Sequence, residues 1–106
     1  MEERRSPCPL SCTLDLIGDK WTLLIIRDML FGKTLFKQFT ASPERIASNI
    51  LSNRLSRLVQ AGLATKIEDG YHLTERGQSL GPIVQSLAQW GLKHIPNTAA
   101  LLGPET

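Results

Sequence analysis

The stretch "ASNILSNRLSRLVQAG", residues 47–62, decides which fold this chain adopts. At 100° per residue its aliphatic side chains gather on one arc of a helix. The opposite arc holds Ser48, Asn49, Ser52, Asn53, Ser56 and Arg57. Serine and asparagine are indifferent helix formers, so repeating them on one face lowers helix stability without a structural gain. Asparagine and arginine can instead pair with base edges, and serine can bind bases or phosphate. The pattern therefore favours a DNA-recognition helix.

Three shorter helices are predicted before this stretch. Their expected ranges are residues 8–17, 20–31 and 34–41. Asp19 can cap the second helix, which is apolar nearly all round and should lie buried at the centre of the fold. Pro43 closes the third, because the residue before a proline avoids helical angles.

A β-hairpin and a last helix are predicted after Gly62. The sequence "LATKIEDGYHLT" holds two short β-like runs divided at Asp69-Gly70. Thr74 can then cap a helix over residues 75–95, which Pro82 should bend. Helices followed by a hairpin and another helix are the order of a winged helix-turn-helix. The predicted fold is therefore mainly α with a small β-hairpin (α+β).

The length of 106 residues allows one domain. We expect a flexible segment over residues 1–7, the winged helix over 8–95 and a flexible tail over 96–106. The longest apolar run is interrupted by Arg27 and Asp28, and the start of the chain resembles no signal peptide. These features predict a cytoplasmic protein without a membrane segment.

Positive charge is concentrated in the middle of the chain. Between residues 31 and 67 the basic residues are Lys33, Lys37, Arg45, Arg54, Arg57 and Lys66, opposed only by Glu44. All of these except Arg54 are predicted to contact DNA phosphates or bases. The helical angle of Arg54 falls inside the apolar arc. We therefore expect it to pair with Asp15, Asp19 or Asp28, or to extend to the surface.

Several segments together resemble the HxlR-type (MarR-like winged helix-turn-helix) transcriptional regulators. They are "CPLSCTLDLIGDKWTLLIIRDMLFGKTLFKQF", "ILSNRLSRLVQAGL", "YHLTERGQSL" and "LAQWGLKH". The resemblance implies a homodimer that binds a pseudo-palindromic DNA operator, with the first and last helices at the subunit interface. It places the recognition helix on residues 47–60 and the wing on residues 64–74.

The hairpin departs from the family pattern because it is short and carries Glu68 and Asp69 at its tip. We therefore expect Lys66 or His72 to contact the DNA backbone from the base of the wing. For the dimer interface the predicted residues are Leu10, Leu14, Leu80, Ile83, Val84, Leu87 and Trp90. The alternative for Trp90 is packing inside its own subunit.

Two interpretations stay open for Cys8. In the resembled family a cysteine at this position serves some members as a sensor of oxidants or electrophiles. A helix start favours a thiolate, although Pro9 removes one amide donor. The other interpretation is a small apolar residue, which is also our interpretation of Cys12. Because His72 and His94 are the only histidines, no metal site or cofactor is predicted.

Other classes of function fit the sequence less well. It contains no glycine-rich phosphate loop, no paired carboxylates and no nucleophile with a base beside it, so we expect no enzyme. A winged-helix module that binds proteins is the alternative, since a fold alone does not decide function. The basic residues around the recognition helix favour a DNA-binding regulator, expected to be a repressor, with an effector that the sequence does not identify.

Overall fold

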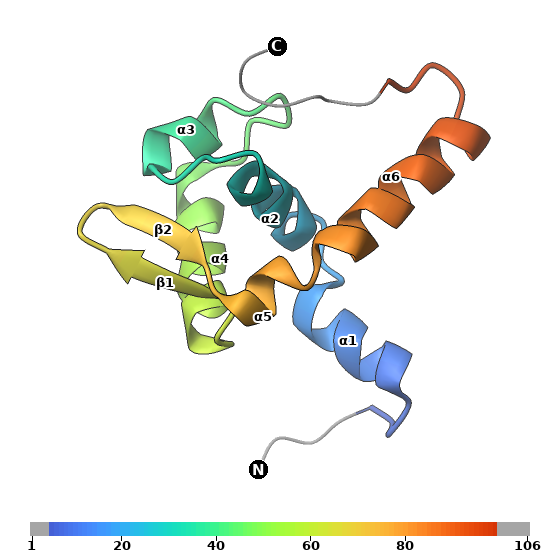
Figure 1. The fold of residues 1–106 in the computed structure, drawn as a ribbon, viewed down its shortest axis with the longest axis horizontal. Helices are drawn as coiled ribbons and strands as arrows, with labels where there is room; N and C mark the ends of the chain where they lie inside the picture. Colours follow the sequence, from blue (N-terminus) through green and yellow to red (C-terminus); the bar gives the residue numbers. More distant parts are fainter. Residues whose placement is uncertain (1–4, 100–106) are drawn as a thin grey trace.

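The computed structural model describes residues 5–99 of the chain. Its elements are α1 (Pro9–Ile17), α2 (Thr22–Leu30), α3 (Phe36–Thr40), α4 (Ser48–Gln60), β1 (Ala64–Ile67), β2 (Gly70–Leu73), α5 (Glu75–Gln78) and α6 (Gly81–His94) (Figure 1). This architecture confirms the predicted mainly α fold with a small antiparallel hairpin.

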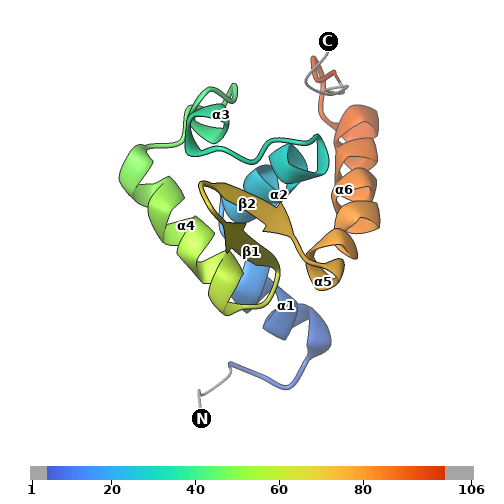
Figure 2. The ribbon, with the colours of Figure 1, turned by 60° about the vertical axis from the view of Figure 1, so that its left-hand side comes forward.

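The helix α2 lies at the centre of the fold, between α4 and α6 (Figure 2). Its side chains Ile25 and Ile26 are buried against a core that includes Phe39, Leu51 and Leu55. The prediction that the second helix is buried is therefore confirmed, although it begins at Thr22 and not at residue 20.

The start of α2 is fixed by a side chain from the preceding turn. Asp19 Oδ2 accepts hydrogen bonds from the backbone amides of Trp21 and Thr22, at 3.1 and 3.2 Å. These amides belong to the first turn of a helix, where they have no backbone acceptor. Asp19 thus satisfies the amides at the start of α2 as expected of a capping residue, although the N-cap position is Trp21 and not Asp19.

The helices α3 and α4 form the helix-turn-helix. Before α3, the Gln38 side chain accepts the backbone amides of Thr34 and Leu35, both at 2.9 Å. The helix ends at Thr40, so Pro43 lies in the turn. Leu51, Leu55 and Leu58 bury one side of α4. Gly62 follows α4 with φ +75°, which a residue without a side chain adopts readily.

The hairpin forms with Glu68 and Asp69 at its tip, as predicted, although the Asp69-Gly70 turn signal lies one residue too late in the sequence. Ile67 pairs with Gly70, so the turn residues are Glu68 and Asp69 and not Asp69-Gly70. Gly70 instead begins β2 and forms a bridge with Leu35. A Cβ on Gly70 would lie 3.0 Å from His72 Nε2, so glycine there permits close packing. Glu68 takes the positive φ, +54°, at the turn.

The predicted last helix is divided into two. Thr74 does cap a helix, because its Oγ1 accepts the Gly77 amide at 3.1 Å, but α5 ends at Gln78. A Cβ on Gly77 would come within 2.1 Å of the Leu63 carbonyl oxygen, so α5 packs tightly there. The chain then starts α6 with Pro82 in the first turn, where proline fits a helix. The prediction that Pro82 bends a continuous helix was wrong, since it lies at a helix start.

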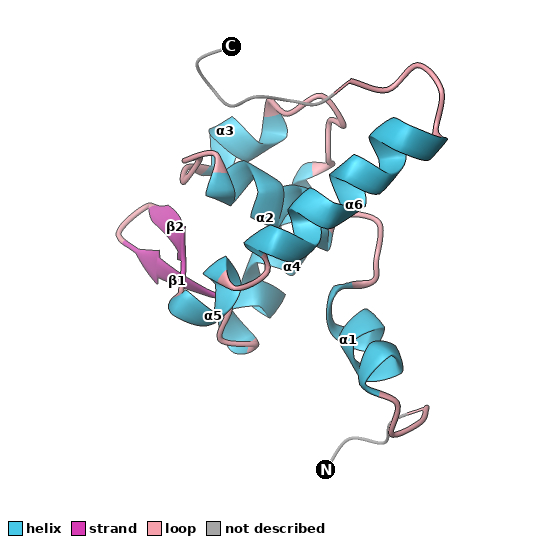
Figure 3. Ribbon diagram, turned by 45° about the vertical axis from the view of Figure 1, so that its right-hand side comes forward, coloured by secondary structure: helices cyan, strands magenta, loops and turns pink. Residues whose placement is uncertain are grey.

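The two terminal helices extend from this core (Figure 3). Only Ile17 of α1 is buried, and no residue of α6 is. Within residues 5–99, no helix is long and apolar enough to cross a membrane. The two segments predicted to be flexible are residues 1–7 and 96–106. Of these, residues 1–4 and 100–106 lie outside the described residues.

Candidate nucleic-acid interface

One face of α4 is polar and fully available to a partner. All the side chains that the sequence placed on the outer arc are exposed, and they are Ser48, Asn49, Ser52, Asn53, Ser56 and Arg57. Leu51, Leu55 and Leu58 on the opposite side are exposed by 2% or less. The buried face fixes which side of α4 points outward. We call the six exposed residues the polar face of α4.

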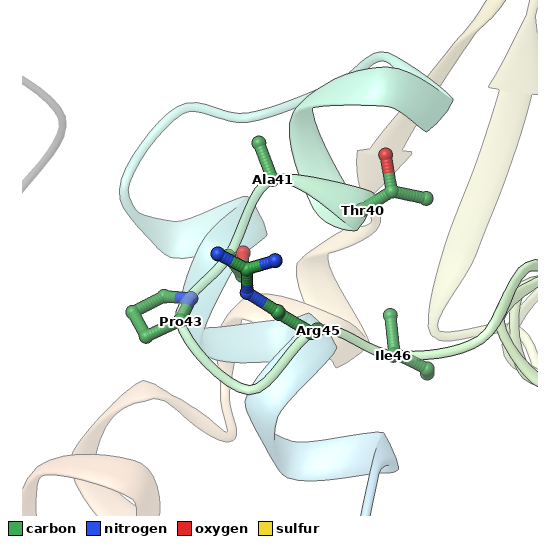
Figure 4. A pocket seen from close by; sticks show the side chains of 6 residues that line it. Thr40, Ala41, Pro43, Arg45 and Ile46 are labelled. Carbon is green, nitrogen blue, oxygen red and sulfur yellow. The ribbon is translucent and has the colours of Figure 1, made fainter.

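Basic residues lie on the elements next to this face. Lys37 of α3 and Arg45 of the turn before α4 are exposed. Arg45 has φ +53° and helps to line an open hollow of about 590 Å³ (Figure 4). The other lining residues are Thr40, Ala41, Ser42, Pro43 and Ile46. Cations on α3 and in the turn itself give this end of α4 a positive surface.

Lys33 differs from the other predicted DNA contacts because it is held within the protein. Its Nζ donates to Ser42 Oγ at 2.9 Å and lies 3.9 Å from Asp28 Oδ1. Ser42 Oγ also donates to Asp28 Oδ2, and both residues are buried. The Lys33 side chain is only 21% exposed. Lys33 therefore links α2 to the turn before α4 within the protein.

A second ion-pair group fixes the same turn, and it was not predicted from the sequence. Both terminal nitrogens of Arg27 bind the Glu44 carboxylate at 2.8 Å, and Nη2 also binds Asp28 at 2.8 Å. The hydrogen bond with Glu44 raises the pKa of Arg27 and lowers the pKa of Glu44. The only signal in the sequence was the presence of Arg27 and Asp28 within an apolar run. Glu44 is thus engaged internally, although it lies between basic residues in the sequence.

Arg54 has one of its three predicted partners. Its Nε donates to Asp19 Oδ2 at 2.8 Å. Asp15 pairs with Arg5 instead, at 2.7 Å. Burial alone would raise the pKa of Asp19, but hydrogen bonds from Thr22 and Arg54 outweigh it and lower the pKa to about 2. Asp19 therefore ties the start of α2 to the middle of α4.

The wing carries its basic residues near its middle and base. Lys66 and His72 are exposed on β1 and β2. Lys66 Nζ lies 5.6 Å from the centre of the Tyr71 ring, within the range of a cation–π contact. The acidic residues Glu68 and Asp69 occupy the tip.

The predicted dimer residues fall into two groups. The exposed group consists of Leu10 and Leu14 of α1 and Ile83, Leu87 and Trp90 of α6. The other group, Leu80 and Val84, packs partly against the core of its own chain. Trp90 is 59% exposed, so its own subunit does not cover it. Leu92 and Ile95, which the sequence analysis did not select, are exposed beside it.

Cys8 is exposed at the N-terminal cap of α1. Its backbone amide donates to Ser6 Oγ at 3.2 Å. Cys12 is partly buried, and its Sγ donates to the Ser6 carbonyl at 3.4 Å. The two thiols thus differ in access. Among residues 5–99, no group of three or more histidines, cysteines or carboxylates is placed to hold a metal ion.

The sequence of this chain is similar to those of bacterial regulators. A family model described as HxlR-like helix-turn-helix matches residues 16–99. An uncharacterized HTH-type transcriptional regulator of Mycobacterium tuberculosis (strain ATCC 25618 / H37Rv) is 38% identical over 90 residues, 78% of this chain and 56% of the relative. The chain thus spans about half the length of that relative. The uncharacterized HTH-type transcriptional regulator YdeP of Bacillus subtilis (strain 168) is 31% identical over 82% of this chain and 73% of its own.

Solved structures of a redox regulator and of a quinone-bound protein share the fold. The redox regulator HypR in its reduced form matches with a TM-score of 0.73 and 30% identity, over 84% of this chain and 95% of HypR. Quinone-bound YodB from B. subtilis matches with a TM-score of 0.72 and 30% identity, over 81% of this chain and 99% of YodB. The winged-helix fold, the match over residues 16–99 and these relatives agree: the chain belongs to the HxlR-like helix-turn-helix family, whose members are transcriptional regulators and not enzymes.

Proposed function

We propose that this protein is a sequence-specific DNA-binding regulator that binds a pseudo-palindromic operator as a homodimer and represses transcription there. In each subunit α4 would enter the major groove, with the polar face towards the bases. Lys37, Arg45 and Arg57 would contact phosphates or bases around it, and Lys66 or His72 would contact the backbone from the wing.

One observation carries this proposal: the polar face of α4 is exposed along its whole length and contains no acidic residue. Carboxylates on that face would repel phosphates, whereas amides, hydroxyls and a guanidinium can bind base edges and phosphate oxygens. Because the buried leucines hold α4 with its polar face outward, that face is free to enter the major groove of DNA.

The dimer follows from the size of a half-site. One recognition helix covers only a few base pairs, so useful specificity needs two helices about 34 Å apart on successive turns of the major groove. The uncovered apolar residues of α1 and α6 supply a surface for a second copy.

The test is selection of bound fragments from a random DNA pool by the purified protein, followed by affinity measurements on the selected site. We expect two related half-sites. Lys37, Arg45, Arg57 and Lys66 on each of two subunits would make about eight phosphate contacts. Raising salt from 50 to 200 mM should then weaken binding by about 10³–10⁵-fold. The substitution Lys37→Ala should weaken binding to all sequences about equally.

The opposite result is equally clear. A pool from which no sequence is enriched, or binding that ignores salt, would contradict DNA recognition. It would favour the protein-interaction module that the same fold permits.

We also propose Cys8 as the group through which an oxidant or electrophile acts. Support comes from its exposed thiol, its place on α1 and the similarity to HypR and to quinone-bound YodB. The Cys8 thiolate would add to a ring carbon of a quinone. One S–C bond would form, the C=C π bond would break with its electrons moving to the carbonyl oxygen, and that oxygen would take up the proton released to solvent when the thiol ionised. Operator affinity is measured before and after quinone treatment. We expect a change in the wild type and in Cys12→Ser, but not in Cys8→Ser. If quinone treatment left the operator affinity unchanged in all three proteins, Cys8 would have no role in the regulation.

A further inference from the structure

Arg54 binds two other residues through different nitrogens of its guanidinium. Its Nε donates to Asp19 Oδ2 at 2.8 Å, and its Nη1 donates to Asn53 Oδ1 at 2.5 Å. Asp19 comes from the turn between α1 and α2, whereas Asn53 belongs to the polar face of α4. The guanidinium therefore connects the polar face of α4 to the turn before α2.

The Asp19 end of this connection is rigid. The Asp19 carboxylate accepts the backbone amides of Trp21 and Thr22 and the Thr22 hydroxyl, in addition to Arg54. Because a guanidinium is planar, holding its Nε fixes the direction in which Nη1 points. The Asp19 pKa of about 2 keeps the carboxylate charged at neutral pH. Arg54 is therefore a fixed donor for the Asn53 side chain.

A fixed donor determines which way the Asn53 amide faces. A guanidinium has N–H donors and no acceptor, so the atom that faces it must be the Asn53 oxygen. The amide Nδ2 then points away from Arg54. Since the Asn53 side chain is exposed, both of its N–H donors are available to a partner, whereas one of the two lone pairs of its oxygen is already engaged by Arg54.

We propose that Arg54 is a specificity-determining positioning residue, which turns the Asn53 amide so that it reads bases mainly as a hydrogen-bond donor. This inference rests on the proposed function, because it assigns the base preference of the same site. An asparagine with both groups free pairs bidentately with adenine, giving to N7 and accepting from N6. With its oxygen held, Asn53 matches guanine, which offers two acceptors, O6 and N7, and disfavours cytosine, which offers an amino donor.

Asn49 provides a comparison within α4. It is exposed on the polar face one turn before Asn53, and no hydrogen bond to its amide occurs among residues 5–99. Asn49 therefore keeps its acceptor and is expected to retain the ordinary preference of asparagine for adenine. Two asparagines on one helix would thus read different bases.

The experiment compares sequence profiles selected from a random DNA pool by the wild type and by Arg54→Lys. A lysine ammonium on its flexible stem can keep the pair with Asp19, but it lacks the planar fork that holds a second nitrogen in a fixed direction towards Asn53. We expect the variant to fold and to bind the wild-type site within tenfold of the parent. The preference for guanine over adenine should fall about tenfold at one position of each half-site, the position that Asn53→Ala also relaxes. The double variant should match Asn53→Ala alone.

Arg57→Lys is the matched control, because Arg57 lies on the same helix and face. It should weaken binding without changing that base position. If Arg54→Lys is too unstable to use, Asp19→Asn can replace it. The amide of this variant still accepts the Trp21 and Thr22 backbone hydrogens but holds Arg54 less firmly, so the same position should relax in part.

The outcomes separate this inference from the proposed function. A wild type that selects no sequence would overturn both. A wild type that selects a clear operator, with adenine or cytosine at the Asn53 position or with a profile that neither Arg54→Lys nor Asp19→Asn alters there, would overturn only the role of Arg54. A change spread equally over all positions would reduce Arg54 to a residue that supports the fold.

Discussion

The helices α4 and α6 have similar lengths, 13 and 14 residues, and both carry aliphatic side chains at helical spacing. In α4 the side chains Leu51, Leu55 and Leu58 are buried by the chain itself, whereas α6 buries no residue. The same kind of pattern thus has two different outcomes. An apolar stripe in a sequence shows that a helix face needs a cover, and the rest of the fold decides whether the chain or a partner provides it.

Removing a buried side chain from α4 should give the largest effect. Leu55 is 0% exposed, and Leu55→Ala should lower the free energy of unfolding by about 3–4 kcal/mol, because lost burial and a residual cavity both contribute. Urea unfolding measures this. The matched control is Leu87→Ala, whose side chain is 55% exposed. Its effect should depend on protein concentration, since it acts through association. Equal, concentration-independent losses in both variants would mean that α6 packs as α4 does.

A charge on the uncovered stripe of α6 should have the next largest effect. Trp90→Asp should weaken association of two subunits by about 2 kcal/mol or more. The substitution replaces a large apolar side chain with a carboxylate, and burying that charge costs free energy. Light scattering over a concentration series should show folded monomers, with helix content kept. Val59→Asp, on an exposed position of α4, should leave the assembly unchanged. A wild type that is already monomeric at micromolar concentration would defeat this explanation of α6.

The smallest effect concerns the ion pair between Asp19 and Arg54 of α4. Here too the two helices differ, because α6 forms no ion pair among residues 5–99. The pKa of Asp19 is lowered from 3.8 to about 2, so its contribution is complete above about pH 4 and is lost as pH falls towards 2. Because the pair is partly open to water, we expect about 1 kcal/mol. Urea unfolding from pH 6 to pH 2 measures it. The stability difference between wild type and Asp19→Asn should shrink over the acid part of that range. A constant difference would show that this carboxylate is not the cause.

Local pattern was sufficient to predict α4 and its two faces. The leucines of α4 and its polar face could be assigned from 3.6-residue spacing alone, and the misplaced angle of Arg54 correctly indicated an acidic partner. Choosing Asp19 from three candidates needed the tertiary structure, because the two residues lie 35 positions apart. The role of Lys33 could not be predicted for the same reason. Its partners come from α2 and from the turn before α4, and nothing near it in sequence distinguishes it from Lys37.

The errors in the hairpin and the last helix also have a tertiary cause. Asp69-Gly70 is a strong local turn signal, yet Gly70 pairs with Ile67 and forms a bridge with Leu35, so it belongs to strand β2. Continuous helical spacing from Glu75 onward concealed a break, because Gly77 packs against the Leu63 carbonyl and sets α5 in its own direction. In both places a contact with a distant segment, at Leu35 or at Leu63, decides the local structure, and sequence spacing does not reveal it.

The stripe on α6 begins on the core at Leu80 and Val84 and continues past it through Leu87 and Trp90. Both halves therefore share one rotational phase. Inserting a single residue after Val84 would turn everything beyond it by about 100° and point Trp90 away from the stripe, although no residue of α6 is buried in this chain. A helix that looks tolerant of length changes in an isolated subunit should thus accept them only in steps of about seven residues, which return the outer half to the same side.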